Sequence, residues 1–184
     1  MEIIETKIPD VKIFQPKKFS DSRGFFSETY NKKLMANNNI NLDFVQDNHS
    51  YSKQKYTLRG LHFQTAPYSQ DKLVRVLKGS IIDVAVDLRR NSPTYKDYVM
   101  EKISYNNFKQ ILVPKGFAHG ILTLEDETEV SYKVTNFYSP ENDRGIIWND
   151  STLNIEWPID SNQIILSEKD KLHGEFNQTE TYFD

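Results

Sequence analysis

The sequence predicts an all-β domain in which short antiparallel strands form a sandwich or a barrel. Three observations lead to this fold class: short alternating apolar segments recur along the chain, turn-forming residues separate them, and few segments favour helix. Many short strands with regular turns are typical of antiparallel sandwiches and barrels. Such a fold buries one face of every strand, so a polar side chain on an inward face is costly unless it serves an interior site.

One helix is predicted early in the chain, at about residues 31–38. Lys32, Lys33, Leu34, Met35 and Ala36 favour helix, and the run of Asn residues that follows ends it.

Strand alternation is clearest in two neighbouring segments, 72–77 and 80–88. In the first, Lys72, Val74 and Val76 share one face. Lys78-Gly79 between the segments is typical of a tight turn. The residues that share a face of the second segment are Ile82, Val84, Val86 and Leu88. Further strands are predicted near 56–64, 98–104, 109–113, 117–124, 128–137 and 145–149.

Composition favours one globular domain, residues 1–184, with a substantial apolar core. Hydrophobic residues make up 38% of the 184, and no linker or repeat divides them. Formal net charge is −3, from 23 Lys and Arg against 26 Asp and Glu. This balance gives no overall positive electrostatic field that would attract nucleic acid or an anionic membrane. The chain has no cysteine, no secretory signal pattern and no membrane-length apolar run, so we expect a cytoplasmic protein.

The segment Leu58–Gln64 combines a cation and an imidazole in one apolar strand. Burying Arg59 without an anion costs several kcal/mol, so a bound phosphate or carboxylate explains it; the alternative is an Arg at the rim beside a hydrogen-bonded core His62. Strict alternation puts Arg59 and His62 on opposite faces, unless a bulge at Gly60 shifts the register.

Two other inward positions carry the same ambiguity. Tyr132 shares a face with Val130 and Val134, which is typical of a core tyrosine with a satisfied hydroxyl. A phenol in a dry pocket is alternatively a general acid. His119, in Phe117-Ala118-His119-Gly120, leaves both interpretations open.

Asp170 also has two interpretations. Ser167-Glu168-Lys169-Asp170 has the spacing of a capping box and predicts the start of a short helical turn. The alternative is a carboxylate that orients His62 and raises its basicity. We expect one residue not to serve both roles easily.

Several motifs that mark metal sites and other enzyme classes are absent from the sequence. His62-Phe63-Gln64 has one histidine where a metal-binding cluster needs two with a nearby Glu, so neither a structural nor a catalytic metal is expected. The chain lacks the glycine-rich dinucleotide motif, the phosphate-binding loop of NTPases and the serine nucleophile elbow.

Taken in order, the motifs resemble the dTDP-4-dehydrorhamnose 3,5-epimerase family, an RmlC-like branch of the cupins. The resemblance covers nearly the whole chain. It rests on residues 21–28, 46–52, 58–64, 72–74, 83–89, 92–95, 114–120, 132–133, 148–150, 155–158 and 166–170.

The resemblance implies a jelly-roll barrel, a homodimer that exchanges its amino-terminal strands, and no cofactor. It also implies epimerisation of a dTDP-4-keto-6-deoxy sugar at C3 and C5. His62 would accept the proton, Asp170 would orient it, and Tyr132 would donate a proton. Tyr138 would stack on thymine. The other implied substrate-binding residues are Arg23, Glu28, Gln46, Asp47, Asn48, Arg59, Lys72, His119 and Lys169, with Asp143 where the family often has Glu.

Lys72 and His119 are expected to stabilise an enolate oxygen. Three alternatives stay open on the sequence: inversion at C3 or C5 alone, another nucleotide sugar as substrate, and a non-catalytic cupin that only binds the sugar nucleotide.

Overall fold

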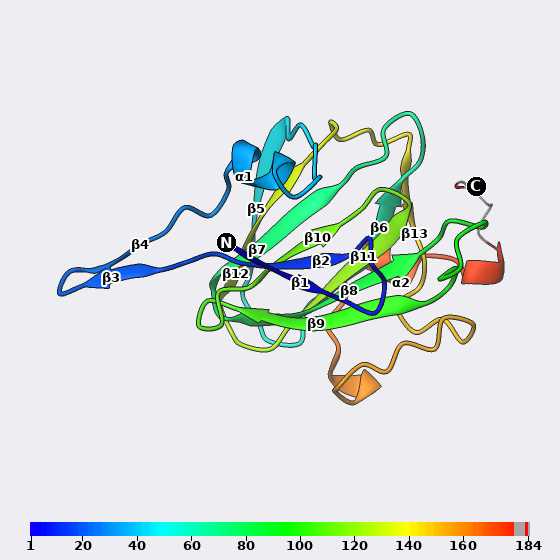
Figure 1. The fold of residues 1–184 in the computed structure, drawn as a ribbon. Helices are drawn as coiled ribbons and strands as arrows, with labels where there is room; N and C mark the ends of the chain where they lie inside the picture. Colours follow the sequence, from blue (N-terminus) through cyan, green and yellow to red (C-terminus); the bar gives the residue numbers. More distant parts are fainter. Residues whose placement is uncertain (179–182, 184) are drawn as a thin grey trace.

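Two antiparallel β-sheets packed face to face form the body of the molecule, in a computed structural model that describes residues 1–178 and 183 (Figure 1). The six-stranded sheet has the order β1 (Glu2–Glu5), β2 (Lys12–Gln15), β10 (Gln110–Val113), β7 (Lys72–Lys78), β12 (Thr128–Val134) and β5 (Gln46–Ser52). The five-stranded sheet has the order β13 (Asp143–Gly145), β6 (Leu58–Gln64), β11 (Phe117–Thr123), β8 (Ser80–Asp87) and β9 (Tyr98–Ser104). The all-β, jelly-roll-like fold class predicted from the sequence is confirmed.

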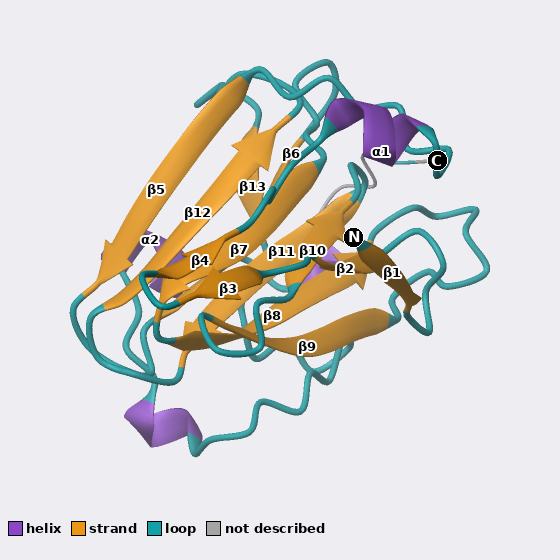
Figure 2. Ribbon diagram, turned by 60° about the vertical axis from the view of Figure 1, so that its left-hand side comes forward, coloured by secondary structure: helices purple, strands orange, loops and turns teal. Residues whose placement is uncertain are grey.

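The few helices lie at the periphery of this body (Figure 2). They are α1 (Lys32–Ala36), α2 (Glu168–Lys171) and two short 3₁₀ turns, Ser161–Gln163 and Phe176–Gln178. The predicted early helix is confirmed as α1: the Asn31 side chain accepts a hydrogen bond from the Leu34 N–H at 3.1 Å. No helix among the described residues is long and apolar enough to cross a membrane.

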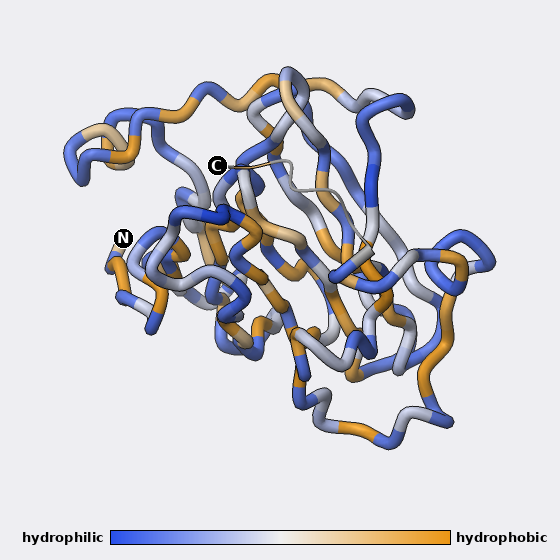
Figure 3. The backbone as a smooth tube through the Cα atoms, turned by 90° about the vertical axis from the view of Figure 1, so that its right-hand side faces the viewer, coloured by the Kyte–Doolittle hydropathy of each residue, from blue (hydrophilic) through white to orange (hydrophobic). Residues whose placement is uncertain are grey.

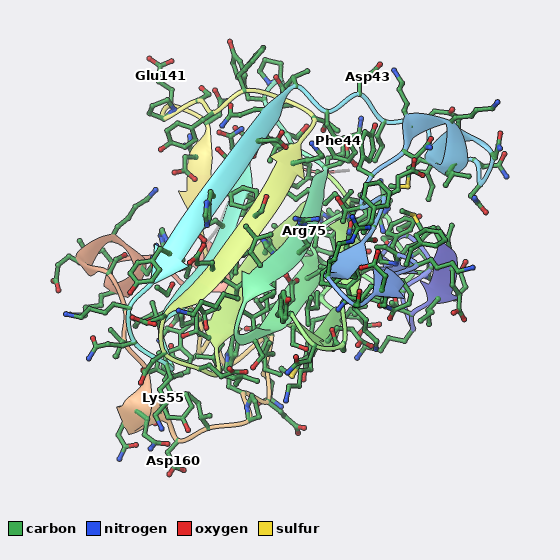
Figure 4. The ribbon with its side chains drawn as sticks, turned by 90° about the vertical axis from the view of Figure 1, so that its left-hand side faces the viewer. Asp43, Phe44, Lys55, Arg75, Glu141 and Asp160 are labelled. Atoms are coloured by element: carbon green, nitrogen blue, oxygen red, sulfur yellow. The ribbon has the colours of Figure 1, made fainter. Side chains whose placement is uncertain are left out.

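The hydrophobic core has three layers, which follow the period-two alternation of the strands. Between the sheets, Val74 and Val76 of β7 pack with Ile81 and Ala85 of β8. The alternate residues of β8, with Val84 and Val86 among them, point outward and are covered by the carboxyl-terminal segment. On the outer side of β7, Leu73 packs beneath α1, and Arg75 lies on the same outer face (Figure 4).

Six of the predicted strands lie close to the observed β6, β7, β8, β9, β10 and β11, and 128–137 corresponds to the shorter β12. The prediction at 145–149 is displaced along the chain, because the strand is Asp143–Gly145 and only the isolated bridge of Ile146 with Gly174 follows it. Strand β5 was missed because its sequence, QDNHSYS, has no apolar alternation. Along the backbone, short hydrophobic stretches alternate with hydrophilic ones (Figure 3).

The hairpin formed by β3 (Phe19–Asp21) and β4 (Gly24–Phe26) projects from the body (Figure 1). Phe19 and Phe26 are 54% and 72% exposed. Exposed aromatic side chains on a projecting arm are typical of a surface that another molecule covers.

Candidate active site

A cavity between the two sheets collects the polar side chains that the sequence singled out. It consists of two hollows, of about 280 and 320 Å³, which share His62, Lys72 and Tyr132. His62 belongs to β6 of the five-stranded sheet, whereas Lys72 and Tyr132 belong to β7 and β12 of the six-stranded sheet. The imidazole and the phenol therefore come from opposing walls of one interior space.

A bulge in β6 brings Arg59 and His62 to the same side of the strand. Arg59 is opposite Ile121 and His62 is opposite His119, so β6 has one more residue than β11 between these pairs. Both side chains line the 280 Å³ hollow. The bulge at Gly60, which the sequence left open as the condition for a shared face, is present.

Gly60 is required at this bulge for two reasons. Its φ is +137°, which L side chains rarely adopt. A Cβ there would lie 2.6 Å from Cα of Gly120 in β11, closer than atoms can approach.

His62 is bound by Asp170. The Nε2 atom of His62 lies 2.5 Å from Oδ1 of Asp170, whose side chain is 4% exposed. Burial alone raises the pKa of Asp170, but the hydrogen bond and charge of His62 together with the Ser167 hydrogen bond hold that pKa below its usual value. With Nε2 donating to the carboxylate, Nδ1 of His62 carries the free lone pair, and it makes no hydrogen bond within the described residues.

Asp170 also takes part in the start of α2. Its backbone N–H donates to Oγ of Ser167 at 3.1 Å, which is the capping interaction that the sequence predicted. The expectation that one residue would not serve both roles is wrong, because the cap uses the backbone N–H and the contact with His62 uses the carboxylate.

His173 was missed by sequence reasoning. Its Nε2 lies 3.3 Å from Oδ1 of Asp170, and its ring centroid is 5.4 Å from that of His62. Burial, together with the charge of His62, lowers the pKa of His173. The i, i+3 spacing from Asp170 was the signal that could have found it.

A second histidine–carboxylate pair lies in the same cavity wall. The Nε2 atom of His119 is 3.0 Å from each carboxylate oxygen of Asp83, which is fully buried in β8. Asp83 was not singled out from the sequence. Its signal was a charged residue on the inward face between Ile81 and Ala85.

Lys72 and Tyr132 have pKa values displaced by burial. Burial lowers the pKa of Lys72 to about 8, against the opposing effect of the Asp143 and Asp83 charges. Burial also raises the pKa of Tyr132 above its usual value, so the phenol stays protonated at neutral pH. The cavity thus holds a histidine with a free lone pair, a protonated phenol and an amine that titrates near physiological pH.

The remaining cavity residues surround the two hollows. Gln46 and Asn48 lie on the inward face of β5, where Nε2 of Gln46 donates to Oδ1 of Asn48 at 2.7 Å. Asp143 accepts hydrogen bonds from the Tyr138 hydroxyl at 3.0 Å and from Nζ of Lys169 at 2.5 Å. Arg59 donates to Oγ of Ser52 and to the Tyr51 carbonyl.

Three of the predicted substrate-binding residues lie outside this cavity. Arg23 is on the projecting hairpin and pairs with Asp21 at 2.7 Å, with its side chain 88% exposed. Glu28 accepts a hydrogen bond from Asn31. Asp47 pairs with Lys133 at 2.7 Å, on the opposite face of β5 from Gln46 and Asn48.

The comparisons with known proteins agree on one enzyme family. A model of the dTDP-4-dehydrorhamnose 3,5-epimerase family matches residues 5–178. A Shigella flexneri protein named dTDP-4-dehydrorhamnose 3,5-epimerase is 50% identical over 171 residues, which cover 92% of this chain and 93% of that protein.

Two solved structures share the fold over almost the full length. The Bacillus anthracis dTDP-4-dehydrorhamnose 3,5-epimerase with TDP and PPi bound has a TM-score of 0.92 and 48% identity, covering 95% of this chain and 99% of that one. A Legionella pneumophila dTDP-6-deoxy-D-glucose-3,5-epimerase in complex with dTDP-4-keto-L-rhamnose has a TM-score of 0.93 and 43% identity, covering 97% and 94%.

Proposed function

This chain belongs to the dTDP-4-dehydrorhamnose 3,5-epimerase family, and we propose that it inverts C3 and C5 of a dTDP-linked 4-keto-6-deoxy sugar with His62 as the base and Tyr132 as the acid. It is an isomerase of dTDP-rhamnose biosynthesis, converting dTDP-4-dehydro-6-deoxy-D-glucose to dTDP-4-dehydro-L-rhamnose. The observation that carries the mechanism is the position of His62 and Tyr132 on opposing sheets around one cavity.

The reaction needs a base on one face of the sugar ring and an acid on the other. The C4 ketone acidifies the hydrogens on C3 and C5, because each carbanion delocalises into an enolate. His62 takes a proton through Nδ1, and Asp170 stabilises the imidazolium that forms. Tyr132 then delivers a proton from the opposite wall, which inverts the centre.

The enolate oxygen needs positive charge or hydrogen-bond donors near C4. Lys72 and His119 line the same hollow as His62 and Tyr132. Because the cavity is interior, an ammonium there stabilises developing negative charge more strongly than in water. Asp83 holds His119 through its Nε2 atom and so fixes the orientation of that ring.

The nucleotide is held by residues around the cavity. Arg59 and Lys169 supply cations for the diphosphate, and the overall acidic chain offers no general field to do so. Lys169 is paired with Asp143, so nucleotide binding would replace a carboxylate partner with a phosphate. Tyr138, 56% exposed, is the aromatic surface available for thymine, with Gln46 and Asn48 nearby.

A homodimer would explain the residues that lie outside the cavity. The hairpin that carries Arg23 projects from its own chain, and Arg23 and Glu28 lie away from the cavity of that chain. In a strand-exchanged dimer the hairpin would reach the partner's cavity and contribute these residues there. The dimer and the cytoplasmic location remain predictions.

Incubation of the purified protein with dTDP-4-keto-6-deoxy-D-glucose in D₂O tests this function. We expect dTDP-4-keto-L-rhamnose as product, with deuterium at both C3 and C5 by NMR. Deuterium at one centre alone would identify a mono-epimerase, and binding without exchange would identify a non-catalytic cupin.

A further inference from the structure

Three side chains with metal-binding atoms meet behind the proposed base. They are His62 of β6, Asp170 of α2 and His173, which follows α2. One ligand atom from each lies within 4.8 Å of the other two. His62 and Asp170 belong to the proposed mechanism, whereas His173 has no role in it.

The donor set and its spacing suit zinc. Two imidazole nitrogens and one carboxylate oxygen form a common three-residue zinc set that leaves a fourth position open. In tetrahedral geometry, zinc–ligand bonds of about 2.0–2.1 Å place neighbouring ligand atoms about 3.3 Å apart. Nε2 of His173 is already 3.3 Å from Oδ1 of Asp170, whereas Nε2 of His62 is 2.5 Å from that oxygen and would move outward when zinc binds.

His173 supplies the second observation. Its Nε2 is buried and makes no hydrogen bond within the described part of the chain, although it lies 3.3 Å from Oδ1 of Asp170. Such a buried polar atom without a partner is uncommon and costs free energy. The ring is held in place over Gly145, where a Cβ would come within 2.3 Å of it.

Neighbouring charges permit a cation here. Asp170 is almost fully buried and brings one negative charge. Lys169, the adjacent cation in sequence, points its ammonium to Asp143 at 2.5 Å.

We propose that a zinc ion binds to Nε2 of His62, Asp170 and Nε2 of His173, and that it switches the enzyme off. This inference rests on the proposed role of His62 as the base. Neutral imidazole has one N–H, which lies on Nε2 when Asp170 accepts it. When zinc takes the Nε2 lone pair, that proton moves through solvent to Nδ1. The nitrogen that faces the substrate then has no lone pair to accept a proton.

The test uses chelator-treated, dialysed full-length protein and zinc alone as the ligand. Affinity is measured by competition with a chromophoric chelator, and Co²⁺ in place of zinc reports tetrahedral geometry through its visible absorption. His173→Phe keeps a ring over Gly145 without a ligand atom, and His173→Gln keeps a polar side chain. His49→Gln is the matched control, because His49 forms an exposed pair with Glu129 at 3.0 Å and belongs to no three-residue cluster within the described residues.

We expect zinc to bind and inhibit the wild-type protein and His49→Gln equally. Both His173 variants should bind zinc at least about tenfold more weakly, and each should be inhibited less relative to its own metal-free rate. Equal zinc affinity in the wild type and both His173 variants, or no binding to the wild type, would overturn the site. Zinc binding that depends on His173 but leaves turnover intact would overturn the switch. Loss of the proposed function itself would instead appear without zinc, as a His62→Asn protein that still epimerises.

Discussion

Oδ1 of Asp170 lies 2.5 Å from Nε2 of His62, although the two residues are 108 positions apart in the sequence. The contact joins α2 to β6 and fixes which nitrogen of the imidazole is free to act as a base. A carboxylate accepts only, so it holds the proton on Nε2 and leaves the lone pair on Nδ1.

Asp170→Asn should therefore lower kcat by about two to four orders of magnitude with little change in KM. The amide of Asn donates to Nε2 and moves the ring proton to Nδ1, the nitrogen that must accept the substrate proton. Ser167→Ala is the control, because it removes only the cap of α2, at a cost of about 1 kcal/mol in the free energy of unfolding. An equal loss of kcat in both variants would return Asp170 to a purely structural role.

Activity should fall at alkaline pH as Lys72 loses its charge. Burial lowers the pKa of this amine to about 8, so the ammonium is present below that pH and is lost above it. Tyr132 does not produce this limb, because burial moves its pKa in the opposite direction. Lys72→Arg should shift the limb to higher pH, since a guanidinium does not titrate in this range. An unchanged limb in the pH profile of kcat would show that Lys72 is not its source.

The bulge at Gly60 should be intolerant of a side chain. Gly60→Ala should lower the free energy of unfolding by about 1–3 kcal/mol or more, because the new Cβ meets Gly120 of β11, and it should displace His62. Gly24→Ala is the matched control: Gly24 has a similar φ of +131°, but a Cβ added there would have nothing within 4 Å. Thermal unfolding of both variants measures the difference, and equal destabilisation would mean that φ alone matters.

Polar residues of the cavity could be identified from the sequence more readily than polar residues on the surface. His62, Lys72, His119 and Tyr132 could be found because they interrupt apolar alternation in strands, and the structure brings them to one cavity. Asp83 interrupts β8 in the same way but was overlooked, and the place of His173 depends on how the chain folds back after α2. Local patterns carry no information on such long-range contacts.

Strand boundaries, too, could be predicted where apolar alternation marks the strand and were missed where it does not. Strands β7 and β8, which alternate between two buried layers, were predicted closely. Strand β5 pairs with β12 through seven polar or aromatic residues, so its position is set by the partner strand rather than by its own alternation.

Complementation between inactive subunits should show where Arg23 acts. Mixing His62→Ala with Arg23→Ala protein should restore some activity, because one of the two sites in a heterodimer receives both native residues if the hairpin is exchanged. Unmixed parents measured at the same concentration are the control. If refolded mixtures stay as inactive as the parents, each site is built from one chain.

The most direct test of the proposed mechanism compares His62→Asn and Tyr132→Phe by deuterium incorporation in D₂O, read at C3 and C5 by NMR. His62→Asn should lose both exchange and epimerisation, because no other group is assigned to remove the proton. Tyr132→Phe loses one hydroxyl, at a cost of about 0.5–1.5 kcal/mol in stability, and should still exchange with retention of configuration while inversion falls by about two to four orders of magnitude. Epimerisation by Tyr132→Phe at close to the wild-type rate would contradict the mechanism and return Tyr132 to the hydrophobic core.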